Sequence, residues 1–286
     1  MKLKDKVAII TGANRGLGAA IAHLFAQEGV NLLLVARDGA LLKTVAESLP
    51  VQPGQKIEWR EADVTSPEDI TAIGNTALEK FGRVDILVNN AGIYGPIGPF
   101  EEVDWAEWLA ALNINLLGAI SLSRQIVPIM KKQGYGKIIN LSGGGATAPL
   151  PRFSAYAVSK AALVRFTETI AEELAEFHID VNAIAPGALN TRLLDQILEA
   201  GPQLAGEQMY QRSLKQQQEG GASMEIGAEL AVFLASEQSD GISGRLISAI
   251  WDDWRNLTEK REKLKKSDVF TLRRIVPEDR GWEVTK

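Results

Sequence analysis

Short apolar segments alternate with longer segments of helical periodicity through most of the chain, and this alternation constrains the fold more than any other feature. Seven segments have the length and apolar character of β-strands: 6–10, 31–35, 56–60, 84–88, 137–141, 180–185 and 245–250. Helical periodicity occupies five intervals: 16–28, 67–80, 104–132, 154–176 and 226–235. Asp104 and Ser154 are the expected N-caps of two of these helices. The alternation predicts right-handed crossovers and a parallel sheet covered on both faces.

Composition excludes several classes of partner. The chain has 286 residues with 45% hydrophobic and 23% charged, which fits one globular α/β domain. A net charge of −5 disfavours nucleic acid and anionic membranes. There is no cysteine and there are only two histidines, so we expect neither a disulfide nor a metal site. No apolar run approaches the roughly 18 residues of a membrane span, and no signal-peptide core is found, so we expect a cytoplasmic protein.

The C-terminal segment differs in character from the rest. Ten of the fifteen residues 252–266 are charged, and Trp254, Leu257 and Leu264 form a narrow helical stripe. We therefore expect a single domain over 1–250 and a charged helical extension over 251–286. The extension is expected to pack on the body or on a neighbouring subunit; a lid over the substrate and disorder are the alternatives.

The glycine-rich segment TGANRGLG, residues 11–18, follows the first predicted strand and opens the first predicted helix. Glycine allows a tight turn and lets the backbone approach a pyrophosphate, which the helix N-terminus then faces. The spacing of Gly12, Gly16 and Gly18 is GxxxGxG, which differs from the common GxGxxG fingerprint. The position favours a dinucleotide site, although glycine loops also open α/β helices for purely steric reasons.

Several motifs in order resemble the short-chain dehydrogenase/reductase family over about residues 5–250. They are TGANRGLG, NNAG at 89–92, Asn115 in NLLG, Tyr156 and Lys160 in YAVSK, and PGALNT at 186–191. The resemblance implies a Rossmann-like doubly wound parallel sheet of about seven strands, a nicotinamide cofactor and a homodimer or homotetramer. Helices near 104–132 and 154–176 resemble the pair that forms the family's dimer interface.

The resemblance also implies the residues that contact the cofactor: Gly12, Asn14, Arg15, Gly16, Leu17, Gly18, Arg37, Asp63, Val64, Asn90, Ala91, Gly92, Tyr156, Lys160, Pro186, Gly187 and Thr191. Among these, Asp63 resembles the family's adenine contact, and Thr191 belongs to the loop that grips the nicotinamide carboxamide. The bare residues have other interpretations as well, because Asp63 suits a turn at a strand end and a Pro-Gly pair is a general loop signal.

Two arginines indicate which form of the cofactor binds. NAD-binding folds place an acid at the end of the second strand, on the ribose 2′-hydroxyl. That position is Ala36 here, Arg37 follows it, and Arg15 lies inside the glycine turn. Because guanidinium groups bind phosphate well, we expect NADP(H) to be preferred. The alternatives are that both arginines are solvated surface charges and that Asp38 binds the ribose.

Tyr156 and Lys160 stand at i and i+4 and therefore on one helix face. A phenol is a poor base at neutral pH, and a nearby ammonium is expected to favour its ionised form. Tyr156 is thus the expected acid/base, and the resemblance implies that Lys160 also holds the nicotinamide ribose. Asn115 resembles the residue whose backbone anchors a water in a proton relay; an asparagine that bends its helix is the alternative.

The polarising serine of the family usually stands 13 residues before the tyrosine, where this chain has Gly143. Ser142 is one residue earlier and would point to the other strand face unless the strand end is distorted. Three hypotheses follow. Ser142 turns into the site, backbone N–H groups of Gly143 to Gly145 or Thr147 polarise the substrate, or the site has lost redox activity.

The sequence is interpreted as an NADP(H)-dependent oxidoreductase that transfers hydride between the nicotinamide and a carbonyl or alcohol. The rival is a catalytically impaired nucleotide-binding regulatory or scaffold protein of the same fold. Residues between Asn190 and Ser223 correspond to the family's variable substrate lid, and their polar, glutamine-rich character favours a hydroxylated or sugar-like carbonyl. Trp251 and Trp254 are expected either at a subunit interface or facing the substrate.

Overall fold

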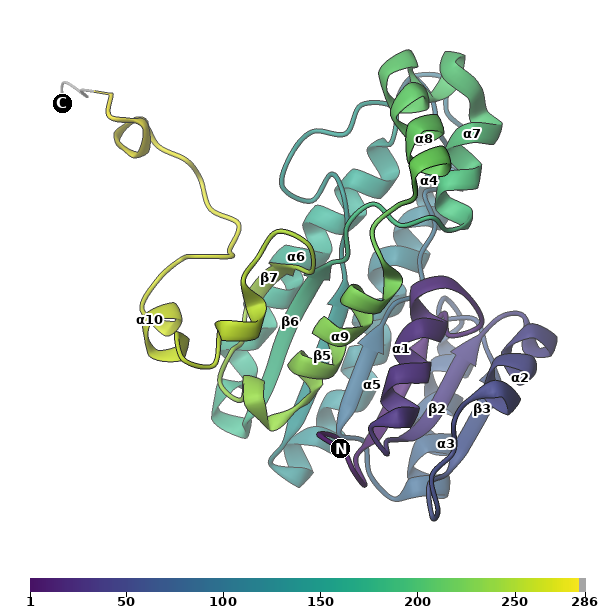
Figure 1. Cartoon of the computed structure of the whole chain (residues 1–286), viewed down its shortest axis with the longest axis vertical. Coiled ribbons are helices and arrows are strands. Elements are labelled where there is room, and N and C mark those ends of the chain that lie inside the picture. The colour runs from purple at the N-terminus through teal and green to yellow at the C-terminus, as the bar shows by residue number, and fades with distance from the viewer. Residues whose placement is uncertain (283–286) are drawn as a thin grey trace.

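The computed structural model describes residues 1–282 and contains a seven-stranded parallel sheet (Figure 1). Its strands are β1 (Val7–Thr11), β2 (Asn31–Ala36), β3 (Ile57–Glu61), β4 (Ile86–Asn89), β5 (Gly136–Leu141), β6 (Ile179–Ala185) and β7 (Arg245–Ser248). The order β3-β2-β1-β4-β5-β6-β7 confirms the predicted doubly wound α/β fold. Strand order reverses between β1 and β4, so a crevice opens beyond the carboxyl ends of these two strands.

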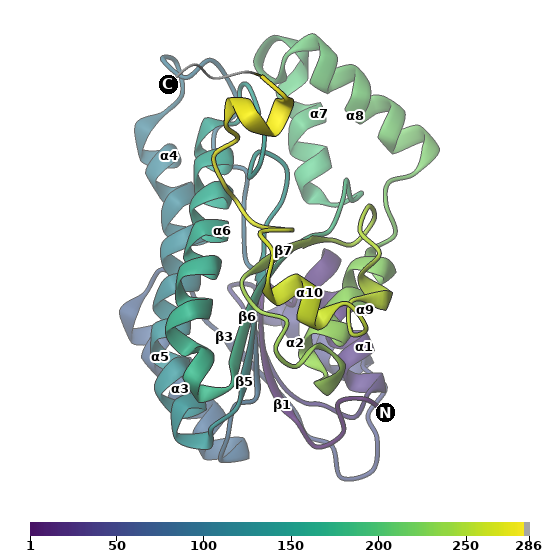
Figure 2. The same ribbon diagram turned by 90° about the vertical axis from the view of Figure 1, so that its left-hand side faces the viewer.

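Helices cover both faces of the sheet (Figure 2). One face carries α1 (Gly16–Gln27), α2 (Gly39–Ser48) and α9 (Met224–Ala235). The other carries α3 (Pro67–Phe81), α5 (Gly118–Gln133) and α6 (Ser154–Leu174). Along β1, Ile9 and Ile10 are both fully buried and belong to the cores on opposite faces. Continuous apolar strands are therefore explained by burial on both sides.

The helix predicted over 104–132 is interrupted. It consists of α4 (Trp105–Leu112), a π-helical turn (Asn113–Leu117) and α5. Asp104 is the N-cap of α4, as predicted, and its Oδ1 accepts a hydrogen bond from the Glu107 N–H at 2.8 Å. Contrary to the expectation from the sequence, the helical stretch Trp105–Gln133 is long and apolar enough to span a membrane. This finding rests on its length and composition alone. One face of α5 packs on the sheet through the buried Leu122 and Ile126.

The predicted N-cap at Ser154 is wrong. Helix α6 begins at Ser154 itself, and Phe153 occupies the cap position without a side-chain cap bond. The Ser154 hydroxyl instead accepts a hydrogen bond of 3.0 Å from the Trp108 indole N–H. A tertiary partner on α4 has thus replaced the local cap.

The polar region over 190–223 folds into two helices, α7 (Arg192–Ala205) and α8 (Glu207–Glu219), which stand above the carboxyl edge of the sheet (Figure 1). Leu194 and Ile197 are buried, so the apolar patch of α7 serves packing.

Residues 251–272 of the extension lie on the body beside β7. Trp254, Leu257 and Leu264 are buried, and the Trp254 ring packs near Phe233 at 5.7 Å between centroids. The Arg245 guanidinium on β7 donates to the carbonyls of Leu264, Ser267 and Val269. Helix α10 (Arg261–Lys265) is short, and the later described residues extend away from the body (Figure 1).

Candidate active site

A cleft of about 980 Å³ runs along the carboxyl edge of the sheet. All residues predicted to contact the cofactor line it, from Gly12 in the first turn to Thr191 before α7. Of the four predicted catalytic residues, Tyr156, Lys160 and Ser142 line it as well, whereas Asn115 is buried behind it. Residues far apart in the sequence thus meet in one place, as the motif order predicted.

The tight turn over residues 11–18 requires glycine, both for its backbone angles and for the space around it. Gly12 and Gly16 have φ of 64° and 54°, which glycine adopts without strain. A Cβ on Gly18 would collide with the Gly12 carbonyl oxygen, and one on Gly12 would lie 2.9 Å from the Asn90 Nδ2. The turn therefore exposes its backbone at the start of α1, where a phosphate would be stabilised.

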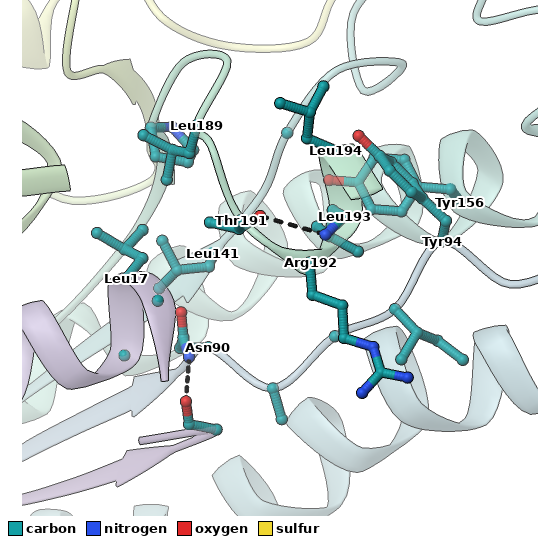
Figure 3. Close-up of a pocket in the computed structure, with 18 of the residues that line it drawn as sticks. Leu17, Asn90, Tyr94, Leu141, Tyr156, Leu189, Thr191, Arg192, Leu193 and Leu194 are labelled. Atoms are coloured by element: carbon teal, nitrogen blue, oxygen red, sulfur yellow. Dashed lines mark hydrogen bonds between the residues drawn. The ribbon is translucent and has the colours of Figure 1, made fainter. Parts of the chain in front are cut away.

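Asn90 (Figure 3) and Thr11 link the glycine turn to the end of β4. The Asn90 carboxamide donates to the Thr11 and Gly12 carbonyls at 2.9 and 3.1 Å. The Thr11 hydroxyl accepts from the backbone N–H groups of Asn90 and Ala91 at 3.0 and 3.1 Å. Thr11 is a structural member of the site that was not among the predicted residues, although it opens the glycine motif.

At the far end of the cleft, both predicted phosphate-binding arginines have carboxylate neighbours. Arg15 lies 3.7 Å from Asp38, and Arg37 lies 4.0 Å from Asp63. Asp38 caps α2 by accepting from the Leu41 N–H at 3.0 Å. These ion pairs are long and half-exposed, so they hold the guanidinium groups weakly.

Asp63 forms the turn that was the alternative to an adenine contact. Its Oδ1 accepts hydrogen bonds from the backbone N–H and the hydroxyl of Thr65, both at 2.8 Å. The residue still lines the cleft beside Val64, so the turn and the adenine contact are compatible.

Tyr156 and Lys160 lie one turn apart on α6, with the Lys160 Nζ 5.6 Å from the Tyr156 ring centroid. The Lys160 ammonium donates to the Leu141 carbonyl at 2.6 Å. Burial lowers the pKa of Lys160 to about 8.

The expectation that the ammonium favours the Tyr156 phenolate is wrong for this structure. Burial, and then the neighbouring Tyr94, raise the pKa of Tyr156 above its ordinary value. The ammonium points to a carbonyl and not to the phenol, so desolvation dominates. Tyr156 therefore keeps its proton at neutral pH, which is the state that can donate to a carbonyl oxygen.

Asn115 uses its whole side chain to hold the loop after β4. Its Oδ1 accepts from the Ile93 N–H and its Nδ2 donates to the Ile93 carbonyl, both at 2.8 Å. Nδ2 also donates to the Ser159 hydroxyl at 3.0 Å. The residue sits in the π-helical turn, so the helix distortion that was the alternative interpretation is present as well.

Ser142 and Gly143 occupy the end of β5 beside Tyr156. The Ser142 side chain is buried and its hydroxyl has no hydrogen-bond partner in the described part of the chain. A Cβ on Gly143 would overlap the Tyr156 hydroxyl and lie 3.2 Å from its Cζ. The phenol thus uses space that any side chain at position 143 would fill.

Three further residues in the cleft were not predicted. Tyr94 packs edge-on against Tyr156, with ring centroids 4.7 Å apart. Arg192 and Arg212 reach the cleft from α7 and α8, and neither forms a salt bridge with a carboxylate among residues 1–282. Tyr94 follows NNAG by two residues, and that proximity was the only signal in the sequence.

Trp254 and Trp251 have different outcomes. Trp254 is buried in the body of its own chain, so the prediction that it lies at a subunit interface or faces the substrate is wrong. Trp251 lines the cleft and is 85% exposed, so it is free to meet a ligand there.

Known proteins share this architecture. A family model described as short chain dehydrogenase matches residues 6–201. The chain is 34% identical over 249 residues to the 3-oxoacyl-[acyl-carrier-protein] reductase of Thermotoga maritima, covering 86% of this chain and 97% of that protein. It is 32% identical over 248 residues to the 7alpha-hydroxysteroid dehydrogenase of Escherichia coli K12, covering 87% and 94%.

Solved structures agree with these sequence relatives. Levodione reductase superposes with a TM-score of 0.80 at 27% identity, covering 90% of this chain and 99% of that one. NAD⁺-bound xylitol dehydrogenase superposes with a TM-score of 0.77 at 28% identity, covering 87% and 98%. The chain therefore belongs to the short-chain dehydrogenase/reductase family and is an NAD(P)-dependent oxidoreductase of carbonyl or alcohol substrates.

Proposed function

We propose that the protein transfers hydride between NADP(H) and a carbonyl or alcohol substrate, with Tyr156 as the acid/base. The observation that carries the proposal is the buried Tyr156–Lys160 pair on α6, which lines the same cleft as the glycine turn. In reduction, the protonated phenol donates to the carbonyl oxygen; in oxidation, it accepts the alcohol proton. Relatives that are named dehydrogenases and reductases favour this enzyme over the rival binding-only protein.

The cleft fits a nicotinamide dinucleotide. The turn around Gly12 and Gly18 leaves no room for a Cβ, so its backbone forms the surface that a pyrophosphate would contact. Thr191 Cγ2 would lie 3.5 Å from a Cβ on Gly16, which brings the loop of Pro186, Gly187 and Thr191 over the same cradle. When bound there, the nicotinamide supplies or accepts the hydride.

NADP(H) is proposed as the preferred form, because Arg15 in the glycine turn and Arg37 after β2 both line the cleft and their carboxylate partners are 3.7 and 4.0 Å away. A 2′-phosphate would form shorter, charge-assisted bonds with these groups. Fluorescence titration should give tighter binding of NADPH than NADH, and Arg37→Ala should weaken NADPH binding selectively. Equal affinities in the wild-type protein would refute the preference.

Lys160 and Asn115 support the proton chemistry in different ways. A charged Lys160 would hold the ribose and stabilise the phenolate that remains after Tyr156 gives up its proton. The Asn115 side chain is fully engaged with Ile93 and Ser159, so its part in a proton relay would fall to its backbone. Ser142, or the backbone N–H groups of Gly143 to Gly145 or Thr147, remain proposed polarisers of the substrate oxygen.

The substrate is proposed to be a polar carbonyl with hydroxyl groups or an anionic group. Gln196, Gln216, Arg192 and Arg212 line the lid side of the cleft, whereas the carboxylates in the lining, Asp38 and Asp63, stand at the cofactor end. Keto-sugars with a phosphate or carboxylate should give a lower KM than neutral steroids. Arg212→Gln should raise that KM while leaving the KM of neutral substrates unchanged.

The protein is proposed to act in the cytoplasm. Its assembly into a homodimer or homotetramer is proposed from the helices α4, α5 and α6. Trp105, Leu109 and Val158 on these helices, and Leu117 in the π-helical turn between α4 and α5, are exposed, and burying them would be favourable. Light scattering after gel filtration should give a multiple of the chain mass of 31.0 kDa.

The central test is oxidation of NADPH in the presence of a panel of ketones, aldehydes, keto-sugars, quinones and diketones. Turnover on at least one member that falls at least about 10²-fold in Tyr156→Phe would support the proposed acid/base. Tight NADPH binding without turnover on any member would instead favour the binding-only rival.

A further inference from the structure

Tyr94 is a second phenol at the reaction end of the cleft. Its ring meets the Tyr156 ring at 71° with centroids 4.7 Å apart. The Phe153 ring also packs against the Tyr94 ring, with centroids 5.2 Å apart. Figure 3 shows the hydroxyls of Tyr94 and Tyr156 at the same end of the two rings. Both residues line the cleft, and their rings are in contact there.

A buried chain of hydrogen bonds fixes the two tyrosines relative to each other. The Asn115 carboxamide binds both backbone groups of Ile93, which directly precedes Tyr94. Asn115 also donates to the Ser159 hydroxyl at 3.0 Å, and this hydroxyl donates to the Tyr156 carbonyl at 2.7 Å. Asn115 and Ser159 are 1% and 0% exposed, so water cannot compete for these bonds. Such preorganisation is what a pair of catalytic donors requires.

The surroundings give the two phenols different tasks. Lys160 stands over the Tyr156 ring at 5.6 Å, and no cation in residues 1–282 stands over the Tyr94 ring. Burial raises the pKa of Tyr94, so it stays protonated throughout the neutral range. Burial raises the pKa of Tyr156 as well, so the adjacent Lys160 is what distinguishes the two: we assign proton transfer to Tyr156 and hydrogen-bond donation to Tyr94.

Ser142 and Thr147 also line the cleft, and Tyr94 is the hydroxyl-bearing residue whose ring contacts Tyr156. Position 143 carries no side chain, and within residues 1–282 the buried Ser142 hydroxyl has no hydrogen-bond partner. We propose that Tyr94 is a further catalytic residue whose hydroxyl hydrogen-bonds the substrate oxygen in place of the side chain that Gly143 lacks. The proposal rests on the proposed function: as hydride adds to the carbonyl carbon and NADPH becomes NADP⁺, the Tyr156 proton moves to the oxygen while Tyr94 stabilises the negative charge.

Tyr94→Phe tests this directly because the ring packing survives and only the hydroxyl is lost. With a substrate that the wild-type enzyme reduces, kcat should fall about 10²–10³-fold, as for the loss of one oxyanion donor. Ser142→Ala should then lose far less. Tyr135→Phe is the matched control, because Tyr135 precedes β5 at the sheet edge opposite the cleft. Affinity for NADPH should be equal in all these variants.

Two further readouts separate catalysis from folding. The product alcohol should bind the NADP⁺ complex of Tyr94→Phe about 2–12-fold more weakly by calorimetry, the range for one lost hydrogen bond. Thermal unfolding with NADPH should match the wild type and so exclude a folding defect. A Tyr94→Phe enzyme with wild-type kcat and alcohol affinity would overturn the proposed role of Tyr94 and leave the proposed function of the protein intact. Absence of wild-type turnover on every substrate would instead overturn the proposed function.

Discussion

Replacing Gly143 by serine is the sharpest test of how the site is built. The change introduces the residue type that the family usually has 13 positions before its tyrosine, so restored or faster turnover is the simple expectation. The structure predicts the opposite. A Cβ at position 143 would overlap the Tyr156 hydroxyl, which must move by about 1 Å before an ordinary contact is regained.

The size of the effect follows from that displacement. A misplacement of about 1 Å at a reacting group costs on the order of 10²-fold in rate, or about 2.7 kcal/mol of barrier. Gly143 does not have a positive φ, so its backbone accepts a side chain and the cost comes from the contact with the phenol. Gly143→Ala and Gly143→Ser should therefore lose kcat to similar extents, whatever the hydroxyl contributes.

Steady-state oxidation of NADPH at saturating substrate measures the loss. Gly144→Ser is the matched control, because a Cβ there meets no heavy atom within 4 Å, and it should retain most of its turnover. Thermal unfolding of each variant would detect overpacking, which typically costs 1–3 kcal/mol in a packed core. A Gly143→Ser enzyme as fast as the wild type, or faster, would show that the phenol does not need the space beside Gly143.

Three other predictions concern groups around the cleft. Burial lowers the pKa of Lys160 to about 8 from 10.5, so between these pH values the unfolded chain binds one proton more than the folded chain. The free energy of unfolding of the wild type, relative to that of Lys160→Met, should therefore rise by up to about 3 kcal/mol from pH 8 to pH 10.5. Urea unfolding measures this difference. A constant difference across that range would contradict the shift. Ser159→Ala should lower kcat more than NADPH affinity, because it breaks the bonds between Asn115 and the Tyr156 carbonyl; unchanged kcat would exclude this coupling. Trp254→Ala should destabilise the protein by about 3–5 kcal/mol by calorimetry, because this buried ring anchors the extension, and a loss below 1 kcal/mol would refute that role.

The fold and the cofactor cradle were predictable because short-range rules determine them. Continuous apolar strands specify a doubly covered parallel sheet, and a tight turn after β1 needs glycine at positions such as Gly18. The π-helical turn at Asn113–Leu117 was not predictable, since its apolar pattern continues that of the flanking helices. Ser154 is not a cap because α6 begins at Ser154 itself, and its hydroxyl accepts a hydrogen bond from Trp108, 46 residues away.

The reaction end was harder to predict because its chemistry depends on burial and long-range contact. Sequence spacing correctly placed Tyr156 and Lys160 on one helix face, but it could not show that the ammonium binds the Leu141 carbonyl. Desolvation then reversed the expected direction of the Tyr156 pKa shift. Tyr94 escaped notice for the same reason: its contact with Tyr156 crosses 62 positions of the chain, and no local pattern marks it.

Asn115 links the π-helical turn to the loop that carries Tyr94 and to the helix that carries Tyr156. In the π-helical turn the Gly118 N–H bonds the Asn113 carbonyl, which inserts an extra residue into the helix at the point where Asn115 faces the loop after β4. From there the carboxamide clamps Ile93 on one side and Ser159 on the other. The helix distortion, which the sequence offered as the alternative to a catalytic role, is therefore compatible with that role: the π-helical turn carries the side chain that links Ile93, the neighbour of Tyr94, to Ser159.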